Sequence, residues 1–179
     1  ENKYPSLTGY IGNPAINIAI MLLIIVGGIG FLTWDDIYTN KWHFKKYRMQ
    51  SKVILVTTAI LIIAPAVFFF FCDFTGLPLA ERILASLFQS VTPRTAGFNT
   101  ADLPAMTGSS KAIMTLLMLV GGSPGSTAGG MKTTTLAVLI LSAFSVCRKK
   151  DDAEVCGRRI DGSTVKNAAA VAVMYFLLF

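Results

Sequence analysis

The sequence predicts an all-α integral membrane protein, built of helix, re-entrant pore loop and helix repeats with a broken inner helix. Of its 179 residues, 53% are hydrophobic and 15% are charged, which is more apolar than an average soluble domain. The apolar residues fall in blocks of roughly 17 to 25, a length that spans about 30 Å of hydrocarbon. Most basic residues lie in two short segments, residues 41–52 and 148–166, as the positive-inside rule requires. We therefore attribute the net charge of +6 to loops that follow the membrane topology, and we expect no nucleic-acid partner.

The first two spans are predicted from hydropathy and loop charge. Span one covers residues 14–33 and leads into a basic loop, residues 37–52, which we expect in the cytoplasm. Span one therefore crosses inward, and span two, residues 53–72, returns outward. Pro65 lies inside span two, where neighbouring helices can satisfy the carbonyl that proline frees.

The next apolar segment shows that the chain makes a hairpin. Residues 109–147 run into a second basic loop, residues 148–162, so this third span also crosses inward. Residues 74–108 must then leave and return on one side, although they are apolar enough to enter the membrane. We expect a re-entrant hairpin that opens with a helix over residues 79–91, started by Pro78. The partly negative C-terminal end of that helix would favour a cation near the membrane centre.

The residues after this helix predict an ion filter. Positions 92–100 read Thr-Pro-Arg-Thr-Ala-Gly-Phe-Asn-Thr, with Thr92 and Pro93 ending the helix and Arg94 expected to brace the filter from behind. Backbone carbonyls replace the water around a potassium ion only where an extended chain turns its oxygens one way, which glycine permits. We expect potassium at the backbone carbonyls of Thr95, Ala96 and Gly97. The candidate filter comprises Thr95, Ala96, Gly97, Phe98 and Asn99.

The third span contains a glycine-rich interruption. It is 39 residues long, nearly twice a span of about 20. We expect two half-helices, residues 111–120 and 133–147, around a loop at membrane depth that faces a cavity. Its small side chains and mobile backbone suit a gate. The candidate gating loop comprises Gly121, Gly122, Ser123, Pro124, Gly125, Ser126, Thr127, Ala128, Gly129, Gly130 and Lys132.

Other interpretations of this loop stay open. Residues 125–130 nearly match a phosphate-binding motif, but Met131 intrudes before Lys132 and an apolar helix precedes the loop in place of a strand. A glycine cluster for helix packing is a second alternative. A third is a secondary transporter or membrane scaffold, with a midplane substrate site at the discontinuous helix. The sequence has no paired carboxylates, activated nucleophile or metal cluster, so we expect neither an enzyme nor a cofactor other than potassium as the transported ion.

Two motifs together resemble a known family. Residues 90–100, with the Gly-Gly-Ser-Pro-Gly-Ser-Thr-Ala-Gly-Gly-Met-Lys-Thr run at 121–133, resemble the third repeat of the TrkH/KtrB family of bacterial potassium-uptake proteins. The resemblance covers essentially the whole chain and implies four helix, pore loop and helix repeats in one longer polypeptide. It places residues 1–36 in the second helix of repeat two, residues 53–147 in repeat three and residues 163–179 at the start of repeat four.

The resemblance also implies a setting and partners. It implies a multi-pass protein of the inner, cytoplasmic membrane, surrounded by lipid, that forms a homodimer and binds a cytosolic ring of nucleotide-binding regulatory subunits, with the basic loops as contacts. It makes Gly97 the filter glycine and residues 121–132 the loop that controls passage. Lys132 either adds positive charge near the path or snorkels from the start of a half-helix. Whether transport is channel-like or a symport with sodium or protons stays open.

Overall fold

The structure is a computed structural model and describes residues 6–41, 43–149, 154–155 and 158–178. The regular elements among these residues are helices, apart from one hairpin of two short strands. The chain comprises two compact units. Unit 1 contains Glu1–Gly28 and Ala59–Met118, and unit 2 contains Ile29–Thr58 and Leu119–Phe179.

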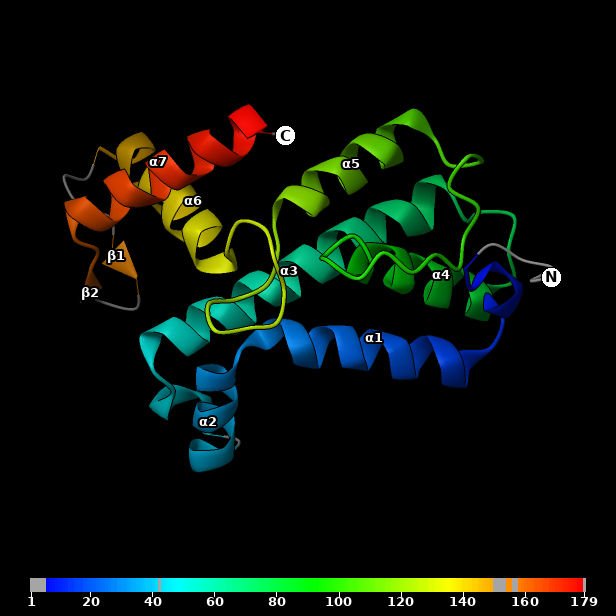
Figure 1. Cartoon of the computed structure of the whole chain (residues 1–179), viewed down its shortest axis with the longest axis horizontal. Helices are drawn as coiled ribbons and strands as arrows, with labels where there is room; N and C mark the ends of the chain where they lie inside the picture. Colours follow the sequence, from blue (N-terminus) through cyan, green and yellow to red (C-terminus); the bar gives the residue numbers. More distant parts are fainter. Residues whose placement is uncertain (1–5, 42, 150–153, 156–157, 179) are drawn as a thin grey trace. The chain divides into compact units, whose positions relative to one another are not determined.

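Unit 1 contains the 3-10 helix η1, most of α1, the second part of α3, α4 and most of α5 (Figure 1). Asn13 begins α1, because its side-chain oxygen accepts hydrogen bonds from the backbone N–H groups of Ala15 and Ile16 at 3.1 and 3.3 Å. Pro78 directly precedes α4, where its fixed φ suits a helix start. The bounds are Thr8–Tyr10 for η1, Pro14–Ile29 for α1, Met49–Cys72 for α3, Leu79–Val91 for α4 and Gly108–Leu119 for α5.

Helix α4 lies at the centre of the packing in unit 1. Phe88 and Val91 of α4 form one buried cluster with Met21 of α1. Ala85, also on α4, belongs to a second cluster with residues of α3 and α5, including the fully buried Phe69. Burial on several sides fixes the position of α4 and of the chain that leaves its C-terminal end.

The two ends of the segment between α3 and α5 are tied together. Asp73, just after α3, accepts a hydrogen bond from the backbone N–H of Thr107 at 2.9 Å and another from the Ser110 hydroxyl. Asp73 thereby satisfies donors at the first turn of α5. The intervening residues therefore leave and return at the same end of unit 1, and the re-entrant hairpin stays a prediction.

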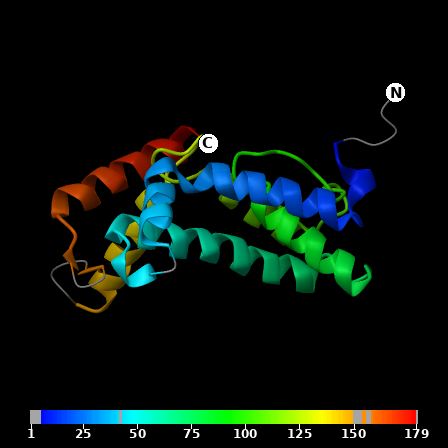
Figure 2. The ribbon, with the colours of Figure 1, turned by 90° about the horizontal axis from the view of Figure 1, so that it is seen from below.

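Unit 2 contains α2, η2, the start of α3, α6, the strand pair and α7. Helices α6 and α7 lie side by side (Figures 1 and 2). The strands pair antiparallel, with Glu154 opposite Arg159 and Val155 opposite Arg158. The bounds are Phe31–Asn40 for α2, Phe44–Lys46 for η2, Thr133–Cys147 for α6, Glu154–Val155 for β1, Arg158–Arg159 for β2 and Gly162–Leu178 for α7.

The structure differs from the sequence prediction around the first basic loop. The single helix expected over residues 14–33 is broken at Gly30, whose φ of 90° and ψ of 146° suit glycine and few other residues. Helical structure resumes in α2 and continues to Asn40, and α3 begins at Met49, so the expected loop at 37–52 is partly helical. The residues just before and just after Gly30 are both apolar, so the hydropathy of the sequence gives no sign of the break.

One described helix, α3, is long and apolar enough by length and composition to cross a membrane. Helices α1 and α2 meet the same criterion as a pair if their bent junction counts as one span. Pro65 lies within α3. Helices α5, α6 and α7 are apolar but shorter.

Candidate ion filter and gating loop

The chain reverses tightly after α4. The backbone N–H of Arg94 donates to the carbonyl of Val91 at 3.2 Å, and that of Thr95 donates to Pro93 at 2.9 Å. Thr95 and Gly97 have positive φ angles of 71° and 79°. For Thr95 this conformation is uncommon, and strained backbone of this kind gathers at functional sites. The predicted filter is therefore a compact turn followed by three residues without regular secondary structure.

Thr92 binds this turn through both of its oxygens. Its carbonyl accepts hydrogen bonds from the N–H groups of Ala96 and Gly97, each at 3.2 Å. Its hydroxyl donates to the carbonyl oxygen of Phe98. Thr92 is only 2% exposed, so water competes little for these bonds.

The far end of the filter is held by a segment distant in sequence. The backbone N–H of Asn99 donates to the Ser6 hydroxyl at 3.0 Å, and the Asn99 carbonyl accepts from the N–H of Leu7 at 2.9 Å. Ser6 and Leu7 precede α1. The chain before the first helix therefore fixes the backbone at Asn99 in both hydrogen-bonding directions.

These contacts divide the filter carbonyls into two groups. The carbonyl oxygens of Phe98 and Asn99 accept hydrogen bonds from Thr92 and Leu7. The carbonyl oxygens of Thr95, Ala96 and Gly97 accept none within the part of the chain that the structure describes. Thr95 and Gly97 are exposed and Ala96 is half-buried. Three adjacent carbonyls thus accept no hydrogen bond from the described residues, and the two bonded carbonyls follow them directly in the chain.

Arg94 is buried beside this turn, with 6% of its surface exposed. The predicted position of Arg94 behind the filter stays a prediction.

The gating-loop candidates form a closed loop with a hydrogen-bonded neck. The N–H of Gly121 donates to the carbonyl of Met131 at 2.9 Å, and that of Met131 donates to Leu119 at 3.1 Å. The N–H of Thr133 donates to Gly122 at 3.1 Å. The hydroxyls of Ser123 and Thr133, both fully buried, lie 3.2 Å apart. Residues 120–133 therefore leave α5 and return to α6 through one narrow neck.

Glycine makes this neck possible. A Cβ added at Gly121 would lie 1.5 Å from the carbonyl oxygen of Gly129, closer than any real contact allows. Gly130 has a φ of 75°, and its added Cβ would lie 3.0 Å from the Gly121 nitrogen. The two sides of the loop therefore touch through backbone atoms.

Lys132 is turned onto the loop itself. Its ammonium donates to the carbonyl oxygen of Ala128 at 2.8 Å, and the residue is half-buried. The positive charge thus lies beside the loop backbone. The remaining candidates, Pro124 to Thr127, form the tip, where the N–H of Ser126 donates to the Ser123 carbonyl at 3.1 Å.

Several residues that shape these segments were not candidates from the sequence. Thr92 was expected to end a helix and begin the filter segment, with no role for its hydroxyl, although a threonine next to a Gly-containing turn could have indicated a hydroxyl brace. Ser6 lies 93 residues from its partner Asn99, so no local pattern could have paired them. Thr133 was expected only as the first residue of a half-helix, and its hydroxyl faces Ser123.

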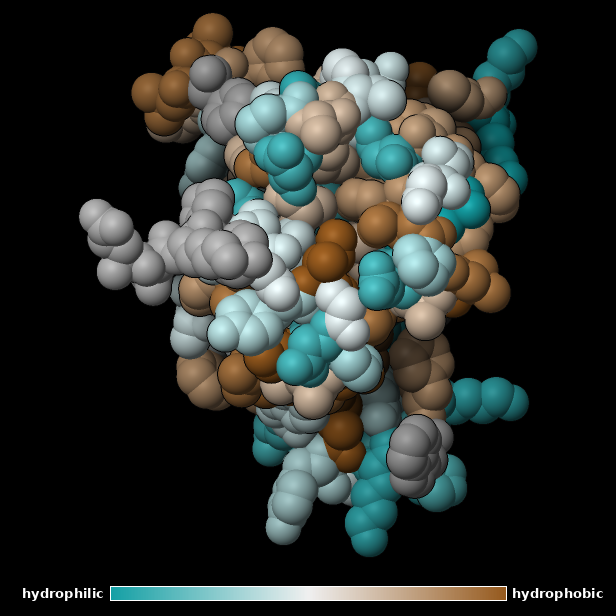
Figure 3. Space-filling view, turned by 90° about the vertical axis from the view of Figure 1, so that its right-hand side faces the viewer, coloured by the Kyte–Doolittle hydropathy of each residue, from teal (hydrophilic) through white to brown (hydrophobic). Residues whose placement is uncertain are grey.

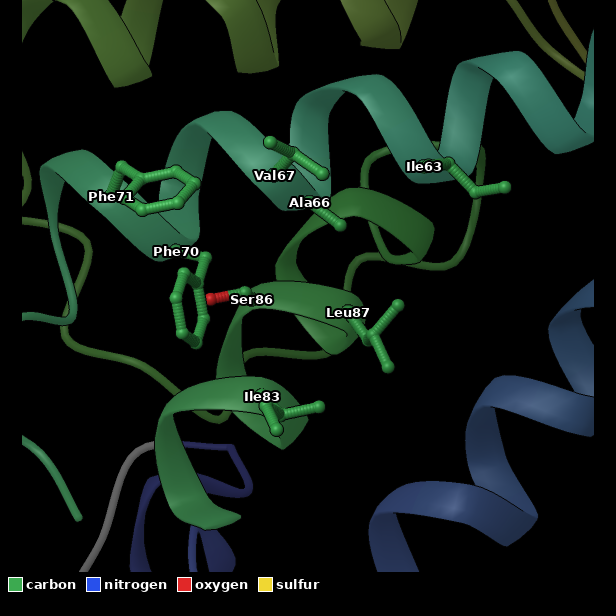
Figure 4. A pocket seen from close by; sticks show the side chains of 8 residues that line it. All are labelled: Ile63, Ala66, Val67, Phe70, Phe71, Ile83, Ser86 and Leu87. Atoms are coloured by element: carbon green, nitrogen blue, oxygen red, sulfur yellow. The ribbon is translucent and has the colours of Figure 1, made fainter. Parts of the chain in front are cut away.

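A cavity of about 290 Å³ on unit 1 offers no cation site. Figure 4 shows its lining, which comes from α3 and α4 and is apolar except for Ser86. The Ser86 hydroxyl donates to the carbonyl of Arg82 at 2.7 Å, within its own helix. The lining residues are Ile63, Ala66, Val67, Phe70, Phe71, Ile83, Ser86 and Leu87.

One side of the molecule carries hydrophilic residues among hydrophobic ones. Figure 3 looks onto the right-hand side of Figure 1, where the first described residues lie. The loop before α5 and its first turns expose Asp102, Thr107 and Lys111. This end of unit 1 therefore suits contact with water.

The sequence matches known proteins along nearly its whole length. Residues 3–179 match the TrkH family model, described as a cation transport protein. The potassium/sodium uptake protein NtpJ of Enterococcus hirae is 39% identical over 161 residues, which cover 87% of this chain and 36% of NtpJ. The Ktr system potassium uptake protein B of Bacillus subtilis is 34% identical over 181 residues, which cover 97% of this chain and 40% of that protein.

A solved structure shares the fold. The crystal structure of the potassium transporter TrkH from Vibrio parahaemolyticus matches 97% of this chain with a TM-score of 0.77 at 19% identity, and the match covers 39% of that protein. The chain thus spans between 36% and 40% of the length of these similar proteins.

Proposed function

Because the chain belongs to the TrkH family of cation transport proteins, we propose that it is part of an integral membrane protein that carries potassium ions across the cytoplasmic membrane. In this proposal, the backbone carbonyls of Thr95, Ala96 and Gly97 replace the hydration shell of the ion. Residues 121–132 form the gating loop. The names of the similar proteins, which include potassium uptake proteins and a potassium transporter, support this substrate.

The observation that carries the proposal is the row of three unbonded carbonyls. An ion loses its water only if protein oxygens replace it, and oxygens that are already oriented need no further ordering when the ion arrives. The hydrogen bonds made by Thr92 and by Leu7 occupy the next two carbonyls and hold the filter segment. The free row is therefore both available and held in place.

Helix α4 adds a favourable field. Its C-terminal end at Val91 directly precedes the filter turn, and the C-terminal end of a helix carries partial negative charge. The 13 residues of α4 extend about 20 Å, or roughly half of a bilayer with its headgroups. This length suits a pore helix in a re-entrant hairpin, and α5 and α6 then form the two halves of the broken inner span.

One chain with one such hairpin supplies a quarter of the filter if the whole protein has four repeats, so the rest of the polypeptide completes the pore. Exposed apolar residues such as Leu23 and Phe71, at 72% and 67%, suit contact with lipid or with those other repeats. A homodimer and a cytosolic ring of nucleotide-binding subunits, bound at the basic segments, complete the proposed assembly.

The proposal is tested by cation uptake in potassium-uptake-deficient cells that carry the full-length protein. The Gly97→Ser variant has space for its side chain but would require a serine at a φ of 79°. We expect rubidium uptake to fall and the preference for rubidium over sodium to relax. Gly76→Ser is the matched control, because Gly76 has no neighbour within 4 Å and no positive φ. Unchanged selectivity in Gly97→Ser at normal membrane expression would overturn the filter assignment.

A further inference from the structure

We propose that Gly30 and Phe31, at the break between α1 and α2, are positioning residues that hold residues 124–126 in the tip of the gating loop. We call this contact the latch. It lies entirely within unit 2 and joins the helix before the pore hairpin to the loop after it. The inference rests on the proposed function, because it assigns a regulatory contact to the same loop.

Gly30 lets the loop tip approach the helix break. A Cβ added at Gly30 would lie 2.6 Å from the carbonyl oxygen of Pro124, and 3.5 Å from atoms of Gly125 and Ser126. The φ of 90° at Gly30 is itself unfavourable for any other residue. Two independent constraints, conformation and space, therefore require glycine at this position.

Phe31 supplies the bond. Its backbone N–H donates to the carbonyl oxygen of Gly125 at 3.1 Å. Phe31 is the first residue of α2, and the first N–H groups of a helix have no partner within the helix. Gly30 has no side chain that could cap α2, so the carbonyl oxygen of Gly125 takes the place of a capping group. Gly125 has a φ of 71°, which only glycine adopts readily, and it presents its carbonyl at the helix end.

The other part of α2 is tied to the basic segment. Asp36, only 3% exposed, accepts hydrogen bonds from the Ser51 hydroxyl at 2.6 Å and from the backbone N–H of Arg48 at 2.9 Å. These bonds join α2 to the start of α3, and residues 41–48 of the basic segment lie between the two helices in sequence. A partner that displaces the basic segment would therefore move α2 and, through Phe31, the loop tip.

The latch predicts a specific consequence for gating. While the Phe31 bond is intact, the tip is held and passage is restricted. When the bond is lost, the tip moves more freely. The neck at Gly121 and Met131 remains closed by its own hydrogen bonds, so the movement is confined to the tip. Conduction rises, and ion preference, which depends on residues 95–97, stays the same.

The sharpest test compares Phe31→Pro with Phe31→Ala in full-length protein, reconstituted in liposomes without regulatory subunits. Proline is well tolerated at the first position of a helix, and it removes the N–H donor together with the phenyl ring. Alanine retains the donor and controls for loss of the phenyl ring, which is 73% exposed. We expect rubidium flux through Phe31→Pro to exceed that through Phe31→Ala by about two- to tenfold, the range for one net hydrogen bond. We expect the same rubidium to sodium ratio in both.

A glycine pair provides a second measurement. Gly30→Ala should raise flux in the same way, whereas Gly28→Ala, two residues away with no neighbour within 4 Å, should behave like wild type. Equal flux through the two Phe31 variants, or a changed ion ratio in Phe31→Pro, would overturn the latch alone. Absence of cation flux through wild type and through both Phe31 variants would overturn the proposed function and the latch with it.

Discussion

The filter segment, residues 92–99, and the gating loop, residues 121–132, are both irregular and glycine-containing, yet they are held by different means. In the filter, the side-chain hydroxyls of Thr92 and Ser6 bond to the backbone of Phe98 and Asn99, directly after the free carbonyls. In the loop, backbone groups at the neck bond to one another, and glycines permit their contact. Side-chain hydroxyls thus add to the main-chain hydrogen bonds of the filter, whereas the neck of the loop is held largely by main-chain groups.

This difference indicates what each segment can tolerate. A hydroxyl can be removed by substitution with little change in volume, so the filter geometry should respond in small steps. Backbone contacts between glycines leave no room for even one added carbon, so the loop should respond abruptly. Substitutions should therefore separate selectivity from gating.

The largest expected effect comes from the neck of the loop. Gly121→Ala would place a Cβ 1.5 Å from the Gly129 carbonyl oxygen, so the backbone must shift. We expect loss of regulated rubidium flux and a destabilisation on the order of 1–3 kcal/mol, typical of overpacking. Thermal unfolding and flux of the purified full-length protein measure both. Gly129→Ala, whose added Cβ has no neighbour within 4 Å, is the control. If both variants behave alike, backbone contact does not hold the neck.

A smaller effect is expected when Thr92 loses its hydroxyl. Thr92→Val removes the donor to the Phe98 carbonyl and keeps the side-chain shape, so that carbonyl is free to turn. We expect the rubidium to sodium preference to fall about two- to tenfold, the worth of one net hydrogen bond. Thr92→Ser restores the donor and should restore selectivity. A serine variant as unselective as the valine variant would contradict the proposed brace.

The smallest effect is expected at Ser6. Ser6→Ala removes one bond to the backbone of Asn99, and the bond from Leu7 remains. Because Ser6 is exposed, water can replace its hydroxyl, and we expect a selectivity change of less than about threefold. Ser6→Gly also lacks the hydroxyl but suits the φ of 59°. Equal ion ratios for both variants would assign the effect to the hydroxyl. A change in the alanine variant alone would assign it to backbone strain.

Local sequence signals predicted several elements well. Pro78 before α4 and the Thr92-Pro93 pair after it indicate a helix over residues 79–91, and α4 has these bounds. The run of glycine, serine and proline at 121–130 indicates an interruption, and α6 begins at Thr133 as expected. Proline and glycine affect the backbone of the residues next to them, so the sequence of one chain is enough to predict these helix ends.

Features that depend on distant contacts were not predictable in this way. The break at Gly30 lies within a continuous apolar run, and its geometry depends on Pro124, far along the chain. The filter candidates follow from the Thr-x-Gly-Phe pattern, but which carbonyls are free depends on Thr92 and on Leu7. Hydrogen bonds between remote segments leave no periodic pattern in the sequence.

The most direct test of the account is anomalous diffraction from crystals of the full-length protein that contain rubidium in place of potassium. The account predicts a rubidium peak within bonding distance of the carbonyl oxygens of Thr95, Ala96 and Gly97. No peak should lie against the hydrogen-bonded carbonyls of Phe98 and Asn99. A rubidium peak found only against residues 121–132, or rubidium peaks that make no contact with residues 95–97, would contradict the account.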